Sequence, residues 1–273
     1  MPDVSSTSDY TPGRERFMLL GPPGVGKSTL FSTLPGKKFA YVFDSNAVAS
    51  YKRPGIDYKE FFADEVSVHA EPLSGAKKDG GGNKREPKTY LEWEAHWDDA
   101  LTTGFFDRYD VIGFDSLTAF QRLVMERTMY MAGRFGSWPS EGDYAPIIGP
   151  ISNVCRALCG MDKTIFVTAH LMERGKKDAG KPDLISLFTR TLRSTIPSLF
   201  TDIYRCIPDV DRNNNKMFFV KTAQDRGDAY LRCSLPGIAV EEEVTIPDDG
   251  WQTPENFGLG ALLKKAEENR RKK

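Results

Sequence analysis

The sequence is poor in cysteine and histidine, which narrows the chemistry open to it. Among its 273 residues are three histidines and four cysteines: Cys155, Cys159, Cys206 and Cys233. They are too few and too scattered for a disulfide framework or a zinc site. The spacing of four between Cys155 and Cys159 favours a buried apolar helix face. We therefore expect a protein of a reducing compartment, without structural metal.

Long apolar runs and an excess of one charge are also missing. No stretch approaches the ~18–20 apolar residues of a membrane span, and the first 16 residues lack the apolar segment of a secretory signal. We expect a cytoplasmic protein without a membrane partner. With 37 basic and 38 acidic residues the net charge is −1, so any contact with nucleic acid must come from local patches.

Hydrophobic residues make up 40% of the chain and charged residues 27%, which is typical of a globular protein. Apolar runs predict strands at 16–20, 39–43, 111–114 and 164–169. Helical patterns separate them at 27–34, 90–101, 118–131 and 152–158. Further strands joined by tight turns are predicted at 203–207, 216–222 and 229–234. This order predicts an α/β fold: a mainly parallel sheet, helices on both faces and an antiparallel C-terminal edge.

We divide the chain into three parts. Residues 1–14 form a flexible lead, residues 15–235 form the main domain, and residues 236–273 form a C-terminal extension with a basic tail. The Gly-, Lys- and Pro-rich residues 74–88 predict an exposed loop.

A phosphate-binding loop follows the first predicted strand. Residues 21–28, GPPGVGKS, fit the pattern G-x-x-x-x-G-K-[ST]. Glycines let backbone N–H groups approach phosphate oxygens, and the helix that follows directs its positive end at the same anion. Lys27 is expected to reach the β- and γ-phosphates, and Ser28 to ligate Mg²⁺. The residues expected to contact ATP are Gly21, Pro22, Pro23, Gly24, Val25, Gly26, Lys27, Ser28 and Thr29.

Magnesium also needs an acidic ligand, and Asp115 is the best candidate. It ends the apolar run Val111–Phe114, and the carboxyl ends of parallel strands lie beside the phosphate loop. Asp115 also suits the N-cap of the following helix, and the two roles are compatible. The sequence therefore predicts Ser28 and Asp115 as metal ligands.

The order of these motifs resembles RecA-type recombinases. Residues 114–120, FDSLTAF, are similar to their Asp-Ser-containing Walker B segment. The chain is similar in particular to phage-encoded RecA-like proteins proposed to act in single-strand annealing and recombination. Residues 34–37 (LPGK) and 168–171 (TAHL) carry much of this resemblance, which covers roughly residues 15–235. It implies a RecA-like ATPase domain, in the cytoplasm of a bacterial host if the protein is phage-encoded.

The resemblance implies further roles at particular positions. His170 falls where a polar residue senses the γ-phosphate, although it could instead merely cap a strand. Lys221 and Arg226 fall near basic residues that reach a neighbouring subunit's nucleotide in a ring or filament. Surface solubility is the alternative explanation for both. The glutamate that positions water in RecA-type enzymes is matched by Asn46, with Asp44 or Glu65 as substitutes. Since an amide cannot accept a proton as a carboxylate does, hydrolysis could be slow.

Two loops are candidates for binding single-stranded DNA. In 133–146 a cation and aromatic rings, Arg134, Phe135 and Trp138, match the composition that stacks unpaired bases. The second, 173–193, carries Arg174, Lys176, Lys177, Lys181, Arg190 and Arg193. The alternative for 133–146 is a hydrophobic plug, and the alternative for 173–193 is a solvated loop. The basic stretches 77–88 and 264–273 are more typical of solvated surface.

Together these features predict an ATPase that couples nucleotide state to single-stranded DNA in phage-type recombination or annealing. Partners would be DNA, further copies of the chain and a single-strand-binding protein. Two alternatives stay open: a nucleotide-switched assembly or loader protein with little hydrolysis, and a small-molecule kinase with residues 173–193 as its lid.

Overall fold

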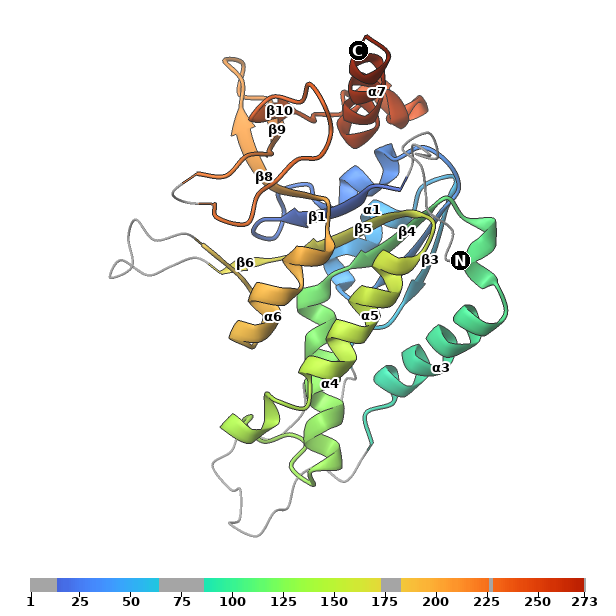
Figure 1. Cartoon of the computed structure of the whole chain (residues 1–273), viewed down its shortest axis with the longest axis vertical. Coiled ribbons are helices and arrows are strands. Elements are labelled where there is room, and N and C mark those ends of the chain that lie inside the picture. The colour runs from blue at the N-terminus through green and yellow to red at the C-terminus, as the bar shows by residue number, and fades with distance from the viewer. Residues whose placement is uncertain (1–13, 64–85, 173–182, 226–227, 273) are drawn as a thin grey trace, which may run out of the picture.

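The computed structural model describes residues 14–63, 86–172, 183–225 and 228–272, and within them one eight-stranded sheet dominates (Figure 1). Six neighbouring strands run parallel, and the last two pair antiparallel at one edge. In spatial order the strands are β10 (Glu241–Glu243), β9 (Lys216–Lys221), β8 (Asp202–Val210), β1 (Arg16–Leu20), β5 (Thr164–Ala169), β4 (Val111–Asp115), β2 (Lys38–Val42) and β3 (Ile56–Glu60). The predicted parallel sheet with an antiparallel C-terminal edge is confirmed.

The central strands are apolar because both faces of the sheet are covered. Every residue of β4 and β5 is buried, as expected for parallel strands between two helical layers. Along β1, Met18 and Leu20 join one apolar cluster, whereas Phe17 and Leu19 join the other. The period of two along a strand thus divides the core into two halves.

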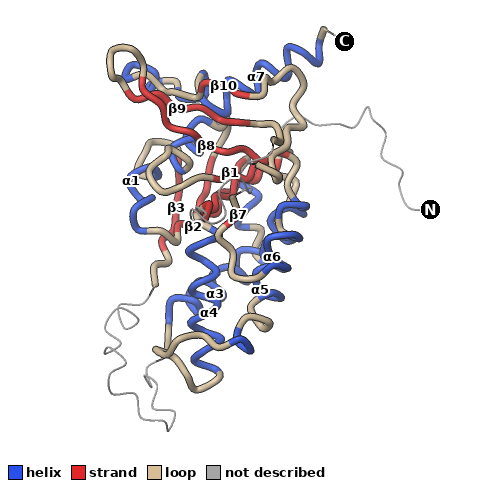
Figure 2. The backbone as a smooth tube through the Cα atoms, turned by 90° about the vertical axis from the view of Figure 1, so that its left-hand side faces the viewer, coloured by secondary structure: helices blue, strands red, loops and turns tan. Residues whose placement is uncertain are grey.

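Helices cover both faces, as predicted (Figures 1 and 2). One face carries α3 (Lys88–Thr102), α4 (Leu117–Met131), α5 (Ile148–Gly160) and α6 (Arg190–Thr195), which supply the larger cluster. The other carries the short 3₁₀ helix η2 (Ser28–Thr33), α1 (Val48–Tyr51) and α7 (Gly258–Arg271). None of the helices in the described residues is long and apolar enough to cross a membrane.

Several elements differ from the sequence prediction. The helix after the phosphate loop is 3₁₀, and residues 229–234 contribute only a single bridge, from Arg232 to Ile203. Strands β3 and β10 and helix α6 were not predicted, because each is short and its pairing or packing comes from distant residues. The basic stretch 264–271 lies on α7, whose Leu259 and Leu262 are buried.

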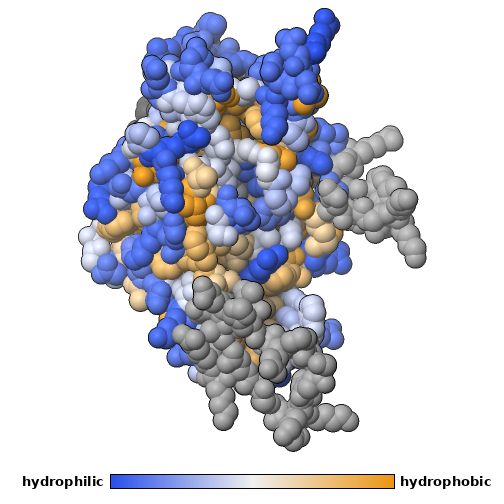
Figure 3. Space-filling view, turned by 180° about the vertical axis from the view of Figure 1, so that it is seen from behind, coloured by the Kyte–Doolittle hydropathy of each residue, from blue (hydrophilic) through white to orange (hydrophobic). Residues whose placement is uncertain are grey.

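Helix α7 packs directly on the helix that follows the phosphate loop. The backbone N–H of Leu259 donates to the hydroxyl of Thr33 at 3.0 Å. Side chains added at Gly258 or Gly260 would collide with Thr33. The space-filling view of the opposite side shows hydrophilic residues over the end that carries α7, and apolar residues gathered nearer the middle (Figure 3).

Candidate nucleotide-binding site

The phosphate loop turns sharply between β1 and η2. Gly24 and Gly26 have φ angles of 81° and 84°, which favour glycine over other residues. A Cβ at Gly26 would also lie 3.2 Å from the ring of Phe218. The loop therefore needs glycine at position 26 both for its backbone conformation and for close approach by β9.

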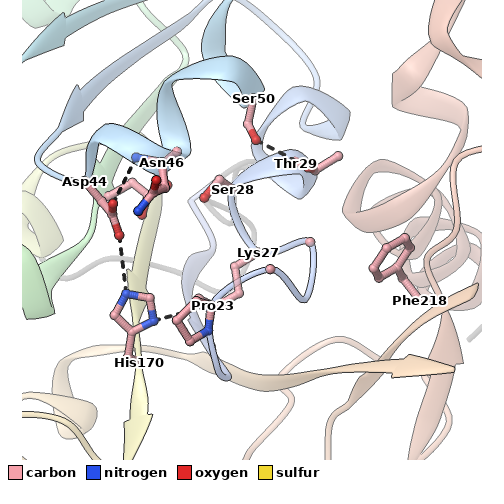
Figure 4. Close-up of a pocket in the computed structure, with 13 residues that line it drawn as sticks. Pro23, Lys27, Ser28, Thr29, Asp44, Asn46, Ser50, His170 and Phe218 are labelled. Carbon is pink, nitrogen blue, oxygen red and sulfur yellow. Dashed lines mark hydrogen bonds and ion pairs between the residues drawn. The ribbon is translucent and has the colours of Figure 1, made fainter. Parts of the chain in front are cut away.

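A pocket of about 270 Å³ opens over this loop at the carboxyl ends of β1, β2, β4 and β5 (Figure 4). Five segments distant in sequence supply its walls: the phosphate loop, residues 44–50 after β2, the end of β4, the end of β5 and strand β9. The lining residues are Pro23, Gly24, Gly26, Lys27, Ser28, Thr29, Asp44, Asn46, Ala47, Ser50, Asp115, His170 and Phe218. The structure thus brings together most of the residues that the sequence singled out for ATP and Mg²⁺.

Lys27 lies over the loop with little exposure, at 5%. Its Nζ donates to the carbonyls of Gly21 at 2.9 Å and Pro22 at 2.7 Å, and lies 3.4 Å from Nδ1 of His170. Burial lowers the pKa of Lys27, whereas nearby acidic groups, among them Asp115, raise it. The ammonium group is bound by neutral carbonyls, so it can turn to an anionic phosphate without breaking an ion pair.

Asp115 is buried, at 3% exposure, at the end of β4. Its Oδ2 accepts a hydrogen bond from the Tyr51 hydroxyl at 2.7 Å, and its Oδ1 accepts one from the Thr168 hydroxyl. Burial, and then the neighbouring carboxylate, raise the pKa of Tyr51 well above its usual value. These hydroxyls fix the carboxylate without neutralising its charge.

The chemistry of these side chains fits a magnesium ion. Ser28 and Asp115 face the same pocket and offer hydroxyl and carboxylate oxygens, which Mg²⁺ prefers. Within the described ranges no three His, Cys, Asp or Glu side chains are grouped as a metal cage. Mg²⁺ does not need one, because it keeps several waters and shares the oxygens of a bound phosphate.

His170 lies between the lysine and an acidic residue. Its Nε2 is 3.5 Å from Oδ2 of Asp44, on the side away from Lys27. The backbone N–H of His170 donates to the Thr118 hydroxyl at 2.9 Å. Burial, and then the charge of Lys27, lower the pKa of His170 below 6.5 against the opposing effect of Asp44. The imidazole is therefore neutral at neutral pH and links both groups.

Asn46, which was matched in sequence to the water-positioning glutamate of RecA-type enzymes, lines the pocket. Its backbone N–H donates to Oδ1 of Asp44 at 3.1 Å, so Asp44 caps the turn while its other oxygen faces His170. Among the described residues 44–50 that line the pocket, Asp44 is the one with an acidic side chain. Glu65, the other substitute considered, lies outside the described residues.

Lys221, one of the two basic residues expected to act on a neighbouring subunit, is not among the residues that line the pocket. Lys221, at the end of β9, forms ion pairs with Asp225 and with Asp228, the latter at 2.8 Å. These pairs raise the pKa of Lys221 against the effect of its burial. Arg226 lies outside the described residues. A role in trans remains a prediction for both.

The loop after α4 only partly matches its prediction. Phe135 is 3% exposed, so it is not available to stack on bases, and the expectation for this residue must be corrected. The ring packs against Tyr130 because the chain turns back on α4 here. Arg134 forms an ion pair with the buried Asp143. Trp138 is 80% exposed and is the aromatic side chain this loop offers to a ligand.

In the second loop, Arg190 is exposed in the first turn of α6, as its prediction requires. Arg193 instead donates from its Nε to the carbonyl of Leu187 at 2.9 Å, which gives it a structural role. Four further basic residues predicted to bind DNA lie outside the described residues: Arg174, Lys176, Lys177 and Lys181.

Several residues at the site were missed from the sequence, including Ala47 and Ser50 of the pocket lining. Tyr51 and Thr168 hold Asp115, and Phe218 closes one end of the pocket. Tyr51 follows Asp44 by seven residues with no motif around it, and Phe218 lies in a strand of ordinary pattern. Only Thr168 carried a signal, as the polar residue inside the apolar run 164–169.

Together, a glycine loop between a strand and a helix, a buried lysine and an aspartate two strands away define an α/β nucleotide-binding domain. Its sheet is mainly parallel with an antiparallel edge, and one strand, β5, lies between the strand before the phosphate loop and the strand that ends in Asp115. The chain belongs to the AAA_24 family of AAA domains, whose model matches residues 14–229.

Two solved structures similar to the chain are archaeal. The flagellar accessory protein FlaH of Methanocaldococcus jannaschii is 13% identical, with a TM-score of 0.39 over 86% of this chain and 87% of that one. The KaiC-like protein PH0186 of Pyrococcus horikoshii OT3 is 10% identical, with a TM-score of 0.39 over 88% and 89%. No curated protein matches the chain significantly.

Proposed function

We propose that this protein is a Mg²⁺-dependent ATPase whose nucleotide state controls binding of single-stranded DNA in phage-type recombination or annealing. The observation that carries the proposal is the position of His170. This residue contacts Lys27 of the phosphate loop and immediately precedes a two-stranded ribbon. A phosphate that draws Lys27 away changes the contacts of His170 first.

Hydrogen bonds connect the ribbon to the site near both of its strands. It consists of β6 (Leu171–Met172) and β7 (Leu184–Ile185). The N–H of Leu171 donates to the carbonyl of Gly21 at 3.4 Å, and that of Ser186 donates to the carbonyl of His170 at 2.8 Å. Movement at the phosphate loop is therefore passed to the ribbon. Its connection contains the four basic residues outside the described part of the chain.

The chemistry of hydrolysis would divide among the pocket residues. Lys27 would bind the β- and γ-phosphates, and Ser28 and Asp115 would hold the metal, which supplies charge for the phosphates in the transition state. Asn46 or Asp44 would orient the attacking water. Because Asn46 cannot take up a proton and Asp44 is engaged by His170, we expect slow turnover without DNA.

The decisive test is steady-state ATP hydrolysis with and without single-stranded DNA, with Lys27→Ala as the blank. We expect DNA to stimulate hydrolysis in the wild type and the stimulation to vanish in the variant. ATP binding without any stimulation would contradict the coupling. Salt dependence of DNA binding adds a check, because contacts to phosphates weaken steeply as salt rises.

A second candidate function rests on Asn46. With an amide at the wall of the pocket, the protein could act as a nucleotide-switched assembly or loader protein that hydrolyses little ATP. In either case the copies would form a ring or filament in which Lys221 and Arg226 act on a neighbour's nucleotide. Lys221 would have to leave its ion pairs with Asp225 and Asp228 to do so. ATP-dependent self-association without DNA binding, measured by light scattering, would favour this candidate.

A further inference from the structure

The pocket extends beyond the phosphate region, and Phe218 closes its far end. In the close-up, Phe218 lies on the opposite side of Lys27 and Thr29 from Asp44 and His170 (Figure 4). Lys27 marks the position of the β- and γ-phosphates in a P-loop. A bound triphosphate with its last phosphate near His170 therefore directs its nucleoside towards Thr29 and Phe218.

Backbone contacts on two sides hold Phe218 in place. In β9 it pairs with Pro208 of β8. On the other side its N–H donates to the Thr245 hydroxyl at 2.9 Å, and its carbonyl accepts from the N–H of Val244 at 2.8 Å. The ring packs over Gly26 of the phosphate loop. Because the ring is positioned before any ligand arrives, binding against it costs little ordering of the protein.

The two ends of the pocket differ in chemistry. Charged side chains gather at the phosphate end, in Lys27, Asp44 and Asp115. Near the middle, the hydroxyls of Thr29 and Ser50 lie 3.4 Å apart, within hydrogen-bonding distance of each other. Phe218 offers an aromatic face. Such a face attracts any base, and a larger base more strongly, without reading its exocyclic groups.

We propose that Phe218 is the base platform of this site and that it makes the protein selective for purine nucleotides by stacking, with little discrimination between adenine and guanine. The proposal rests on the nucleotide binding proposed above. It does not depend on coupling to DNA.

The test compares ATP with inorganic tripolyphosphate, which has the phosphates but no base. We would measure both affinities by calorimetry with Mg²⁺ for the wild type, Phe218→Ala, Phe218→Trp and Phe219→Ala. Phe219 is the matched control, since it is also half-buried but its neighbouring position in β9 points to the other face of the sheet. Thermal unfolding of each variant checks that it is folded.

Phe218→Ala should weaken ATP binding roughly 5- to 100-fold and leave tripolyphosphate unchanged. Phe218→Trp should keep ATP affinity, and Phe219→Ala should change neither ligand. In the wild type, GTP should bind within about tenfold of ATP and CTP more weakly than both. Equal losses for ATP and tripolyphosphate in Phe218→Ala, or no loss, would overturn the platform.

A wild type that prefers one purine by more than about tenfold would overturn recognition by stacking alone. Two other outcomes would contradict the proposed nucleotide binding itself. In the first, the wild type binds neither ATP nor tripolyphosphate. In the second, Lys27→Ala binds both ligands as tightly as the wild type does.

Discussion

The phosphate loop at 21–28 and the loop at 133–146 lie at opposite ends of α4 and are built in opposite ways. Helix α4 has 15 residues and is therefore about 22 Å long. In the phosphate loop, the charge of Lys27 is buried and aimed at a pocket. In the distal loop, Phe135 and the pair Arg134–Asp143 secure the chain, and Trp138 faces solvent.

Under the proposed function, this difference corresponds to two ways of preparing for a ligand. A phosphate site must hold its charges in position beforehand, because its binding energy comes from electrostatic contacts in a partly dry pocket. A surface that stacks on flexible strands needs only exposed aromatic area on a secured base. Substitutions at the pocket should therefore act mainly on nucleotide chemistry. In the distal loop the effects should divide between stability, at Phe135, and DNA binding, at Trp138.

The largest effect is expected in the distal loop, where Phe135→Ala and Trp138→Ala should differ in their free energy of unfolding. Phe135→Ala should lower the free energy of unfolding by about 3 kcal/mol, because it leaves a cavity at a buried ring. Trp138→Ala should change it by less than about 0.5 kcal/mol and weaken binding of single-stranded DNA by about 1–3 kcal/mol. Urea unfolding and fluorescence anisotropy measure the two quantities. An equal loss of stability in both variants would remove the distinction.

At the phosphate end, Asp115→Asn should act on catalysis. It keeps the shape of the side chain but removes the negative charge proposed to hold Mg²⁺, so we expect hydrolysis to fall by at least about 100-fold, or about 2.7 kcal/mol. Turnover over a range of Mg²⁺ concentrations provides the measurement. Ser198→Ala, at an exposed hydroxyl outside the pocket lining, is a control that should keep full activity. Unchanged turnover in Asp115→Asn would exclude Asp115 as the metal ligand.

Tyr51→Phe tests whether the Tyr51 hydroxyl positions the carboxylate of Asp115. Removing the hydroxyl that donates to Asp115 should cost about 1.5 kcal/mol of stability, as for hydrogen bonds to charged groups. It should also raise the Mg²⁺ concentration needed for half-maximal activity. Tyr58→Phe is a suitable control, since Tyr58 is the aromatic neighbour of Tyr51 on β3. A loss of stability with an unaltered Mg²⁺ requirement would reduce Tyr51 to a packing role.

The smallest effect should be the dependence of stability on pH. Since the pKa of His170 is lowered by burial and by Lys27, the unfolded chain binds more protons than the folded protein just below pH 6.5. Stability should fall as pH drops below 6.5, until the lowered pKa is passed. His170→Gln should make this slope shallower in urea unfolding at pH 7.5 and 5.5. An identical slope in the variant would show that His170 does not titrate with folding.

Much of the fold follows from patterns that act over a few residues. The apolar runs at 16–20, 111–114 and 164–169 predicted the central strands because only a strand covered on both faces is apolar throughout. Helix α7 was missed because its apolar positions are few, and its burial depends on Thr33 more than two hundred residues earlier.

The sequence by itself determined the phosphate loop, since its glycine and lysine spacing is a local requirement of the backbone and its charges. It also placed Asp115 at a strand end, because strand and aspartate are adjacent in the chain. Only the tertiary structure decided that Tyr51 and Thr168 orient Asp115, that Phe135 is buried and that Phe218 closes the pocket. These features depend on which distant segments meet, and short-range periodicity carries no record of such contacts.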